Sequence, residues 1–535
     1  MIKSVHIFSE NNSKKCDFTQ ASLNRIELSN NWLKKESFSI QIEFKNKIVS
    51  FRNHDYQWVK IDKKRIANWY APKIIRLDND QLVQANQNLG IWEVNNKKPN
   101  TLLWHFNPKN AKPIINYDAN NHKHIIQSIT KNVFKESLAL LFPSQHGIEV
   151  SRSKIPFSAI VCFTDHCDFD ALDNLVVQRR FLKKHDIKIT KGFFLNDYSK
   201  REDTASYEEH SEEIEKWLND GHELAYHSLS QTIKPRTANF KDFMSFEPPF
   251  KNITTWIDHG YHHYNFTQFN SEAQIKDTFT DNLNKKNIKH FWNYIDSGTA
   301  IDGVINQINP EHFTLNSYFK GIKHLEFKTL VSLLTKDIIF HYYISDYGLR
   351  LYRQIGSYFK AIKRKKSIKK HFKFVINITK LIALILPVFL FWRSKKNEKY
   401  PLAEFAPVVF DYESNGKTFS VFQTIEMIDF KTALSENNID LFIKESGLFI
   451  AHTYFSDPMK YHKGKLFQNT NSLDPEVEKR FLYLSKRIQS KEIWNPTLQE
   501  LVGYLEKIKL VTFDCNADGH VYIVNNNTML SRAVK

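Results

Sequence analysis

Residues 158–170 read Ser-Ala-Ile-Val-Cys-Phe-Thr-Asp-His-Cys-Asp-Phe-Asp, and this stretch decides the fold class. Its apolar run, residues 159–163, has the length and composition of a buried strand. The run ends in four side chains that bind metals or transfer protons: Asp165, His166, Asp168 and Asp170. Catalytic groups of α/β proteins lie where strands end and loops begin. The stretch therefore predicts an α/β protein with a metal or acid/base site at this strand end, rather than a solvated acidic turn.

Two later stretches repeat the pattern of an apolar strand that ends in a histidine. Residues 221–228 read Gly-His-Glu-Leu-Ala-Tyr-His-Ser, and residues 447–452 read Gly-Leu-Phe-Ile-Ala-His. Catalytic groups of a parallel barrel come from the carboxyl ends of several different strands. We therefore expect His227 and His452 to lie close to His166 and Asp165.

The three stretches together resemble the polysaccharide deacetylase family, the metal-dependent carbohydrate N- and O-deacetylases that include chitooligosaccharide deacetylases. Residues 163–166, Phe-Thr-Asp-His, stand where the family has Thr-Phe-Asp-Asp. Residues 221–231 are similar to its Gly-His-Glu followed by His-Ser/Thr-x-x-His, and residues 447–452 to its strand ending Leu-x-His. The order of the motifs agrees, and the resemblance covers residues 155–510. It implies a distorted, seven-stranded (β/α) barrel.

The resemblance also implies roles for two of these residues. Asp165 stands at the position of the family's general base, and His452 at that of the acid that protonates the leaving amine or alkoxide. The implied reaction is attack on an acetyl ester or amide by a water that a divalent metal activates. Imidazole suits the acid role because its ordinary pKa is near neutrality. A core histidine is the alternative for His452.

Two positions depart from the metal-binding pattern of the family. His166 replaces the second Asp of the first motif, and Gln231 replaces the second His of the second motif. Glutamine is a poor zinc ligand. The site is therefore either rebuilt or dead, and both hypotheses stay open. A rebuilt site would bind a divalent metal, with Zn²⁺ as the first choice, through His166, His227 and one of Asp168 or His259.

Aromatic residues beside acidic ones indicate a candidate saccharide-binding surface. Trp256 lies two residues before Asp258, and Trp292 lies four residues before Asp296. Sugar rings stack on aromatic faces, while their hydroxyls need polar neighbours. We therefore expect Trp256, Asp258 and Trp292 to contact the substrate, with core packing as the alternative for both tryptophans.

A basic and apolar insertion interrupts the deacetylase-like region. Residues 374–392 are mostly apolar, but the uninterrupted run from Leu381 to Trp392 is short for a span, which needs about 20 residues. Residues 360–399 hold thirteen Lys or Arg against one acid, Glu398, a net charge of +12. Basic residues on both flanks favour an interfacial helix docked on an anionic membrane surface. A span and a buried core helix with snorkelling lysines are the alternatives.

This local concentration of charge explains the basic composition of the chain. Subtracting the +12 of residues 360–399 from the +17 of the whole chain leaves +5 for all other residues. A nucleic-acid-binding protein would distribute its basic residues over a contact surface. We therefore expect no nucleic-acid partner. The expected partners are an acetylated saccharide and an anionic membrane surface.

The length of 535 residues predicts more than one domain. We expect a β-rich accessory domain at 1–150, a polysaccharide-deacetylase-like domain at 151–510 interrupted by a helical insertion at 310–400, and closing strands with a tail at 511–535. Four cysteines without a disulfide framework suit a reducing compartment, and the first residues lack the apolar stretch of a signal peptide. These features favour a peripheral or monotopic protein at the cytoplasmic face of a bacterial inner membrane.

The sequence thus predicts a metal-dependent hydrolase that removes acetyl groups from an N- or O-acetylated saccharide. A cell-surface polysaccharide or its lipid-linked precursor is the expected substrate. The alternative is a catalytically inactive, deacetylase-like protein that binds a glycan or a polysaccharide-biosynthesis partner at the membrane. Bound metal distinguishes a rebuilt site from a dead one.

Overall fold

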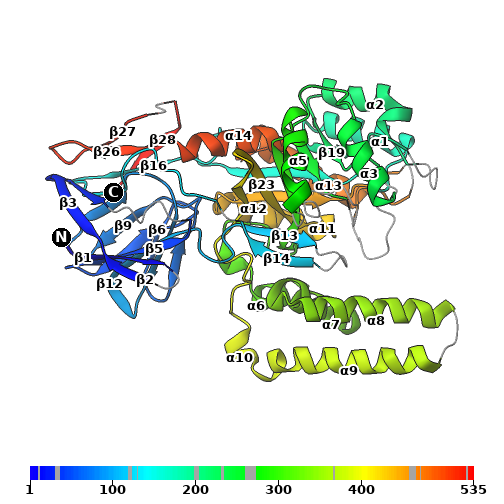
Figure 1. Ribbon diagram of the computed structural model, residues 1–535, viewed down its shortest axis with the longest axis horizontal. Coiled ribbons are helices and arrows are strands. Elements are labelled where there is room, and N and C mark those ends of the chain that lie inside the picture. The colour runs from blue at the N-terminus through cyan, green and yellow to red at the C-terminus, as the bar shows by residue number, and fades with distance from the viewer. Residues whose placement is uncertain are drawn as a thin grey trace.

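The computed structural model describes residues 1–9, 12–29, 36–117, 123–128, 130–197, 204–230, 234–259, 273–364, 368–456, 465–469, 472–525 and 528–535. Figure 1 shows three parts: two β-sheets around the N-terminus, a helix-covered barrel, and a pair of long helices that projects from the barrel. The C-terminus lies beside the N-terminal sheets.

Residues 2–141 supply two antiparallel sheets that share one hydrophobic core. The first sheet has the order β2-β1-β5-β12-β11-β8, and the second has the order β3-β4-β15-β10-β9-β6-β7. In β5 the buried and half-buried residues alternate, as the period-two pattern of a sheet with one covered face requires. The division of the chain into an accessory and a catalytic domain stays a prediction. The strands are β1 (Ile2–Ser9), β2 (Asn12–Lys15), β3 (Asp17–Ser22), β4 (Arg25–Ser29), β5 (Phe38–Phe44), β6 (Ile48–Arg52), β7 (Trp58–Lys60), β8 (Arg65–Ala67), β9 (Ile74–Leu77), β10 (Leu82–Ala85), β11 (Ile91–Asn95), β12 (Lys98–Phe106) and β15 (Ala139–Leu141).

The second part is a closed barrel of seven parallel strands, in the order β17-β18-β19-β20-β21-β23-β24. It closes because β17 pairs with β18 on one side and with β24 on the other. The mixed α/β class and the seven-stranded barrel are thereby confirmed, whereas a specifically deacetylase-like barrel stays a prediction. Its strands are β17 (Ala159–Asp165), β18 (Thr190–Phe193), β19 (Glu223–His227), β20 (Thr255–Ile257), β21 (His290–Thr299), β23 (Lys417–Glu426) and β24 (Leu448–Thr453).

Side chains of each barrel strand alternate between two cores, one inside the barrel and one beneath the surrounding helices. In β17, Val161 and Phe163 belong to the core that includes Phe181 of α1, whereas Ile160 and Cys162 belong to a different core. All seven residues of β17 are buried because both of its faces are covered. The surrounding helices are α1 (Leu172–Lys184), α2 (Tyr207–Asn219), α3 (Arg236–Ser245), α5 (Ala273–Lys285), α11 (Phe430–Ala433), α12 (Glu436–Lys444), α13 (Pro475–Gln489) and α14 (Leu498–Lys509).

The predicted helical insertion separates β21 from β22 (Val409–Ser414), an antiparallel neighbour of β23. Two of its helices, α8 (Asp346–Arg364) and α9 (Ile368–Leu390), form an antiparallel pair that projects from the molecule (Figure 1), and we call this pair the helical arm. Helix α9 has 23 residues and continues through Pro387, so it is longer than the apolar run in the sequence. The insertion consists of η2 (Pro310–His312), α6 (Leu315–Ile322), α7 (Phe327–Asp337), η3 (Ile338–Tyr343), α8 (Asp346–Arg364), α9 (Ile368–Leu390) and α10 (Trp392–Lys395).

The strands of residues 511–535 lie outside the seven-stranded barrel, and the assignment of this segment as closing strands and a tail stays a prediction. β26 (Phe513–Cys515) and β27 (Val521–Ile523) pair with each other. β28 (Ser531–Val534) pairs with β16 (Gly147–Val150). Short apolar runs predict strands but not their partners, and here the parallel pairing of β17 with β18 already completes the barrel. Three further strands are β25 (Ile493–Trp494), which is parallel to β17, and the antiparallel pair β13 (Pro113–Tyr117) and β14 (Lys123–Gln127).

A buried carboxyl at the end of α7 makes the stability of the insertion dependent on pH. Asp337 is 2% exposed, and burial raises its pKa to about 8 despite a hydrogen bond from the Tyr400 hydroxyl. In the unfolded chain an aspartate has a pKa of about 3.9. Between pH 4 and 8 the unfolded carboxyl is therefore ionised while the native one stays protonated. The contribution of this carboxyl to the free energy of unfolding is therefore largest below pH 4, and it falls as the pH rises toward 8.

We expect Asp337→Asn to remove this loss, because the amide keeps an acceptor for Tyr400 and has no proton to release. The variant should gain stability relative to the natural chain by up to about 1.4 kcal/mol for each pH unit between 5 and 7.5. Denaturant unfolding of both proteins at these two pH values measures the difference. Equal pH slopes would show that Asp337 is already ionised in the native protein.

Candidate metal centre

The candidate site lies at the carboxyl ends of the barrel strands. His227 is the last residue of β19, His166 follows directly after the end of β17, and His259 is the second residue after the end of β20. His452 is the fifth residue of β24, whose register pairs it with Thr164 of β17. Because all seven strands are parallel, these positions share one rim of the barrel. The structure thus brings together histidines from four different strands.

Three of these rim residues form a group that could hold a metal ion: His166, Asp168 and His227. One ligand atom from each lies within 4.8 Å of the others. Ligand atoms around a tetrahedral zinc ion lie about 3.3 Å apart, given bonds of 2.0–2.1 Å. A small rotation of these side chains therefore suffices to close the set around an ion.

His259 adds a fourth candidate ligand to this group. Its Nε2 lies 2.5 Å from Oδ1 of Asp168, and Nε2 of His227 lies 3.0 Å from Oδ2 of the same carboxylate. The His227 and His259 rings meet edge to face at 4.8 Å. Asp168 therefore joins two histidines from neighbouring strands. Of the sequence alternatives, Asp168 belongs to the three-residue group, and His259 contacts it.

The protonation states of this group suit metal binding. Burial lowers the pKa of His166 well below its ordinary value, so its ring is neutral and offers a lone pair. Its Nε2 is buried and has no hydrogen-bond partner within the described part of the chain. Burial acts to raise the pKa of Asp168, but the nearby His259 and His227 lower it well below the usual range. Neutral imidazole and ionised carboxylate are the forms that coordinate zinc, so the donor set fits such an ion.

Next to this candidate group, His452 forms a hydrogen-bonded pair with Asp296 of β21. Its Nδ1 lies 3.1 Å from Oδ1 of Asp296. Burial favours the neutral ring, but the Asp296 carboxylate raises the pKa of His452 above its ordinary value. The His452 and His166 rings stack at 4.0 Å. A histidine oriented by a carboxylate thus lies directly beside the candidate ligands.

A chain of hydrogen bonds fixes which nitrogen of His452 carries the proton toward Asp296. The indole Nε1 of Trp292 donates to the Thr424 hydroxyl at 2.9 Å, so that oxygen accepts and its own proton is free to donate. The Thr424 hydroxyl donates to Asp296 at 2.7 Å. The Asp296 carboxylate accepts hydrogen bonds from both Thr424 and His452, so Nδ1 of His452 carries the proton of the second bond. Nε2 of His452, which is buried and without a partner among the described residues, is then the nitrogen available for chemistry.

Trp292, a predicted substrate contact, lies at the rim as part of this chain. Its ring meets His166 edge to face at 4.6 Å and His452 at 4.8 Å. It is only 3% exposed, so its contacts in the structure are with the two histidines rather than with solvent. Trp292 therefore packs against the His166 and His452 rings, and its contact with a substrate stays a prediction.

Asp165, the predicted base, does not lie with these histidines. Its carboxylate accepts hydrogen bonds from the Lys191 ammonium, the Thr453 hydroxyl at 3.1 Å and the Phe455 amide at 3.0 Å. The prediction placed Asp165 and His166 in one pocket. Consecutive side chains at a strand end point to opposite faces, so the Asp165 side chain follows Phe163 into the layer beneath the helices.

Asp165 belongs there to a fully buried charged cluster centred on Lys191 of β18. Lys191 also contacts Asp170, with Nζ 2.5 Å from Oδ2, and Gln178 of α1 at 3.1 Å. The Lys191 ammonium lies 5.3 Å from the centre of the Trp217 ring of α2. Burial raises the pKa of Asp165 to about 6, although Lys191 acts in the opposite direction. The cluster connects β17 and β18 to α1 and is remote from the barrel interior.

Trp256 and Asp258, the other predicted substrate contacts, also lie apart from the histidines of the rim. Trp256 is fully buried among Phe243, Phe246 and Tyr226, beneath helix α3. Its indole nitrogen donates to Asp258 at 3.0 Å. The proposed sugar-stacking surface at Trp256 is therefore replaced by core packing, which was the alternative for this residue.

Sequence reasoning missed Asp296, Thr424 and Lys191 as parts of these networks. The signal for Asp296 was present, because an acidic residue followed the aromatic strand residues Trp292 and Tyr294. No spacing rule connects Asp296 with His452, which is 156 residues later. Gln231, on which the rebuilt-or-dead question depends, lies outside the described residues.

Comparisons with known proteins add no family to this geometry. No protein-family model matches the chain, and no curated protein or solved structure is significantly similar to it. The resemblance to polysaccharide deacetylases therefore rests on the motifs quoted above.

Proposed function

We propose that this protein is a metal-dependent hydrolase that removes acetyl groups from an N- or O-acetylated saccharide, such as a cell-surface polysaccharide or its lipid-linked precursor. The observation that supports the proposal is the juxtaposition of two parts at one barrel rim. The first is the group His166, Asp168 and His227, which could hold a metal ion. The second is the His452–Asp296 pair, stacked against His166. Metal-assisted hydrolysis needs an activating cation and a group that transfers protons beside it.

The side chains of the rim have separate tasks in this proposal. A divalent metal, with zinc as the proposed ion, would be held by His166, Asp168 and His227 and would supply Lewis-acid activation of water and of the acetyl carbonyl. His452 presents Nε2 to the leaving amine or alkoxide and donates a proton to it. Asp296 orients the ring through Nδ1 and stabilises its charged form, as the carboxylate of a catalytic triad does.

The placement of Asp165 favours a second candidate function, a protein that binds metal and glycan without hydrolysis. In the resembled family, Asp165 would accept the proton of the attacking water. Here its carboxylate is bonded to Lys191, Thr453 and Phe455 beneath the helices. The hydrolase proposal therefore requires another proton acceptor at the rim, whereas the binding proposal requires none.

Acetate release separates the two candidates. We expect the purified protein, depleted of metal with a chelator and reloaded with Zn²⁺, to release acetate from acetylated chitooligosaccharides or acetylated xylan only in the reloaded state. His452→Gln should lower the rate by about 10²–10⁴, the usual contribution of a general acid or base, without changing the zinc content.

Exposed His520, on the loop between β26 and β27, offers a matched histidine for the control His520→Gln. Metal-loaded protein that retains these saccharides but releases no acetate would support the binding candidate. Equal rates for His452→Gln and the natural chain would remove His452 from the proton-transfer role.

A further inference from the structure

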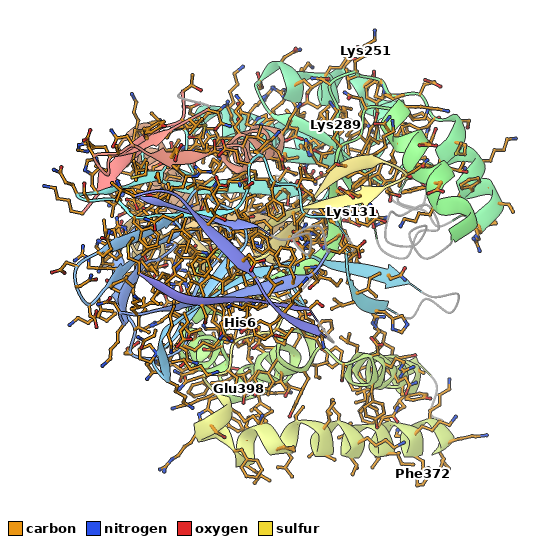
Figure 2. All side chains as sticks on the ribbon, turned by 60° about the vertical axis from the view of Figure 1, so that its left-hand side comes forward. His6, Lys131, Lys251, Lys289, Phe372 and Glu398 are labelled. Atoms are coloured by element: carbon orange, nitrogen blue, oxygen red, sulfur yellow. The ribbon has the colours of Figure 1, made fainter. Side chains whose placement is uncertain are left out.

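The helical arm exposes an apolar stripe on the side of α9 that faces away from the rest of the protein. Figure 2 shows Phe372 at the outer edge of the molecule, pointing away from the barrel. The stripe residues follow one another at intervals of four, three, seven, four and three, which places them on one helix face. We call this set the outer stripe: Ile368, Phe372, Val375, Ile382, Leu386 and Phe389, with exposures of 90, 68, 58, 52, 45 and 43%.

Exposed basic residues flank the outer stripe without any acidic neighbour in the sequence. Lys369, Lys370, Lys373 and Lys380 of α9 are exposed. From Tyr347 to Asn397 the chain contains fourteen Lys or Arg and no Asp or Glu. An apolar helix face bordered by lysines fits the boundary between the acyl chains and anionic headgroups of a bilayer. The same charges would repel an identical positively charged arm, which argues against a second copy of this chain as the occupant.

The packing of the arm argues against a transmembrane orientation of α9. By length and composition α9 is long and apolar enough to cross a membrane, and only 11% of its apolar window is buried. However, α8 runs antiparallel beside it: Phe359 stacks on Phe374 at 6.0 Å, and Asn377 donates to Gln354 at 3.1 Å. A spanning α9 would carry α8 into the hydrocarbon.

Helix α8 is unsuited to that environment. Its residues Arg350, Arg353 and Lys360 are exposed and charged. Charged side chains near the centre of a bilayer are costly unless they face a protein interior or water. Near the root of the arm, Gly348 of α8 lies close against Leu384 of α9, so the two helices stay paired along their length. The charges on α8 therefore favour a pair that lies on a membrane over one that crosses it.

We propose that the helical arm docks flat on an anionic membrane, with the outer stripe of α9 in the interfacial layer and α8 on the protein side. The root of the arm is tied to the barrel rim, because Lys336 of α7 contacts Glu426, the last residue of β23, at 3.4 Å. Docking therefore holds the rim at a fixed place beside the membrane. This inference is independent of the proposed hydrolysis.

Flotation of the full-length protein with vesicles tests the proposal. We expect binding to vesicles of phosphatidylcholine with phosphatidylglycerol, little binding to phosphatidylcholine alone, and weaker binding as salt screens the charges. The triple variant Lys369→Gln, Lys370→Gln, Lys373→Gln should bind about 100-fold more weakly, because each lysine near the surface contributes separately. The exposed lysines 45, 97 and 98 provide a control triple variant with the same loss of charge.

The outer stripe is tested separately from the charges. Ile382→Asp with Leu386→Asp should reduce binding by about 100-fold, because two exposed aliphatic side chains that would enter the interfacial layer are lost. The control is Leu23→Asp with Val133→Asp, which changes two apolar residues outside the arm whose side chains are 73 and 70% exposed. Circular dichroism should show all four variants folded.

Three results would overturn the proposal. The first is unchanged vesicle binding of the Ile382→Asp, Leu386→Asp variant. The second is resistance of the bound natural protein to alkaline carbonate extraction, since a spanning helix stays in the bilayer and an interfacial one is released. The third is a lipid-free dimer, seen by analytical ultracentrifugation, that the stripe variant dissociates while vesicles bind neither protein.

Discussion

Replacing His227 by alanine is expected to lower the affinity of the protein for Zn²⁺ by at least about 100-fold. His227 is one of the three residues whose ligand atoms lie within 4.8 Å of one another. Its loss leaves two ligands and removes one of the two histidines that position the Asp168 carboxylate. Loss of a residue that merely orients a ligand lowers metal affinity by about 10–100-fold, and loss of a ligand itself should lower it more. Equilibrium dialysis with metal analysis measures this effect without reference to activity.

His259 provides an internal comparison for the same measurement. It contacts Asp168 at 2.5 Å but is not in the three-residue group. His259→Ala should therefore reduce zinc affinity by about 10–100-fold, less than His227→Ala. With Co²⁺ in place of zinc, the visible absorption of a tetrahedral site should weaken in the same order. The surface variant His520→Ala should bind metal as the natural chain does. Undiminished zinc binding by His227→Ala would show that the group is not a metal site.

The positions of the rim residues could be predicted from the sequence because they depend on local patterns. An apolar run such as residues 159–163 predicts a buried strand, and a histidine at its end must lie at a rim once the strands are parallel. His166, His227 and His452 meet for this reason. The helical character of residues 310–400 also follows from the local pattern, as α6 to α10 show.

The direction of side chains at the strand ends could not be predicted in the same way. Asp165 and His166 are adjacent, and successive side chains of a strand point to opposite faces. One of the two side chains must therefore lie beneath the helices and the other inside the barrel. The preference is decided by Lys191, which lies 26 residues from Asp165 and pairs with it through the β17–β18 register. The same alternation applies to Trp256, whose side chain lies on the face of β20 beneath the helices and not inside the barrel.

Replacing Lys191 by methionine is expected to lower the free energy of unfolding by about 3–5 kcal/mol. Methionine fills a similar volume but leaves two buried carboxylates without a cation, Asp165 at 0% and Asp170 at 2% side-chain exposure. Removing one partner of a buried ion pair has this cost because the remaining charge cannot be solvated. Denaturant unfolding measures the loss. Lys183→Met is the matched control, because its bond to Asp220 is made by a lysine that is 63% exposed and should contribute no more than about 1 kcal/mol.

Neutralising the whole cluster tests the cause of this loss. In the triple variant Lys191→Met, Asp165→Asn, Asp170→Asn no unpaired charge remains, so most of the lost stability should return. If the triple variant is as unstable as Lys191→Met alone, then packing around Lys191 and Trp217, rather than charge, explains the effect.

The single variant Asp165→Asn then decides between the structural and the catalytic role of this carboxylate. It leaves Lys191 paired with Asp170 at 2.5 Å, so the buried charges stay balanced and the stability should change little. A structural role predicts that acetate release also changes little, since Asp165 faces the helices. The role expected from the family resemblance predicts a loss of about 100-fold or more with zinc content unchanged. A stable, zinc-loaded and inactive Asp165→Asn protein would show that Asp165 turns toward the rim when substrate binds, and the separation of Asp165 from His166 would not hold during the reaction.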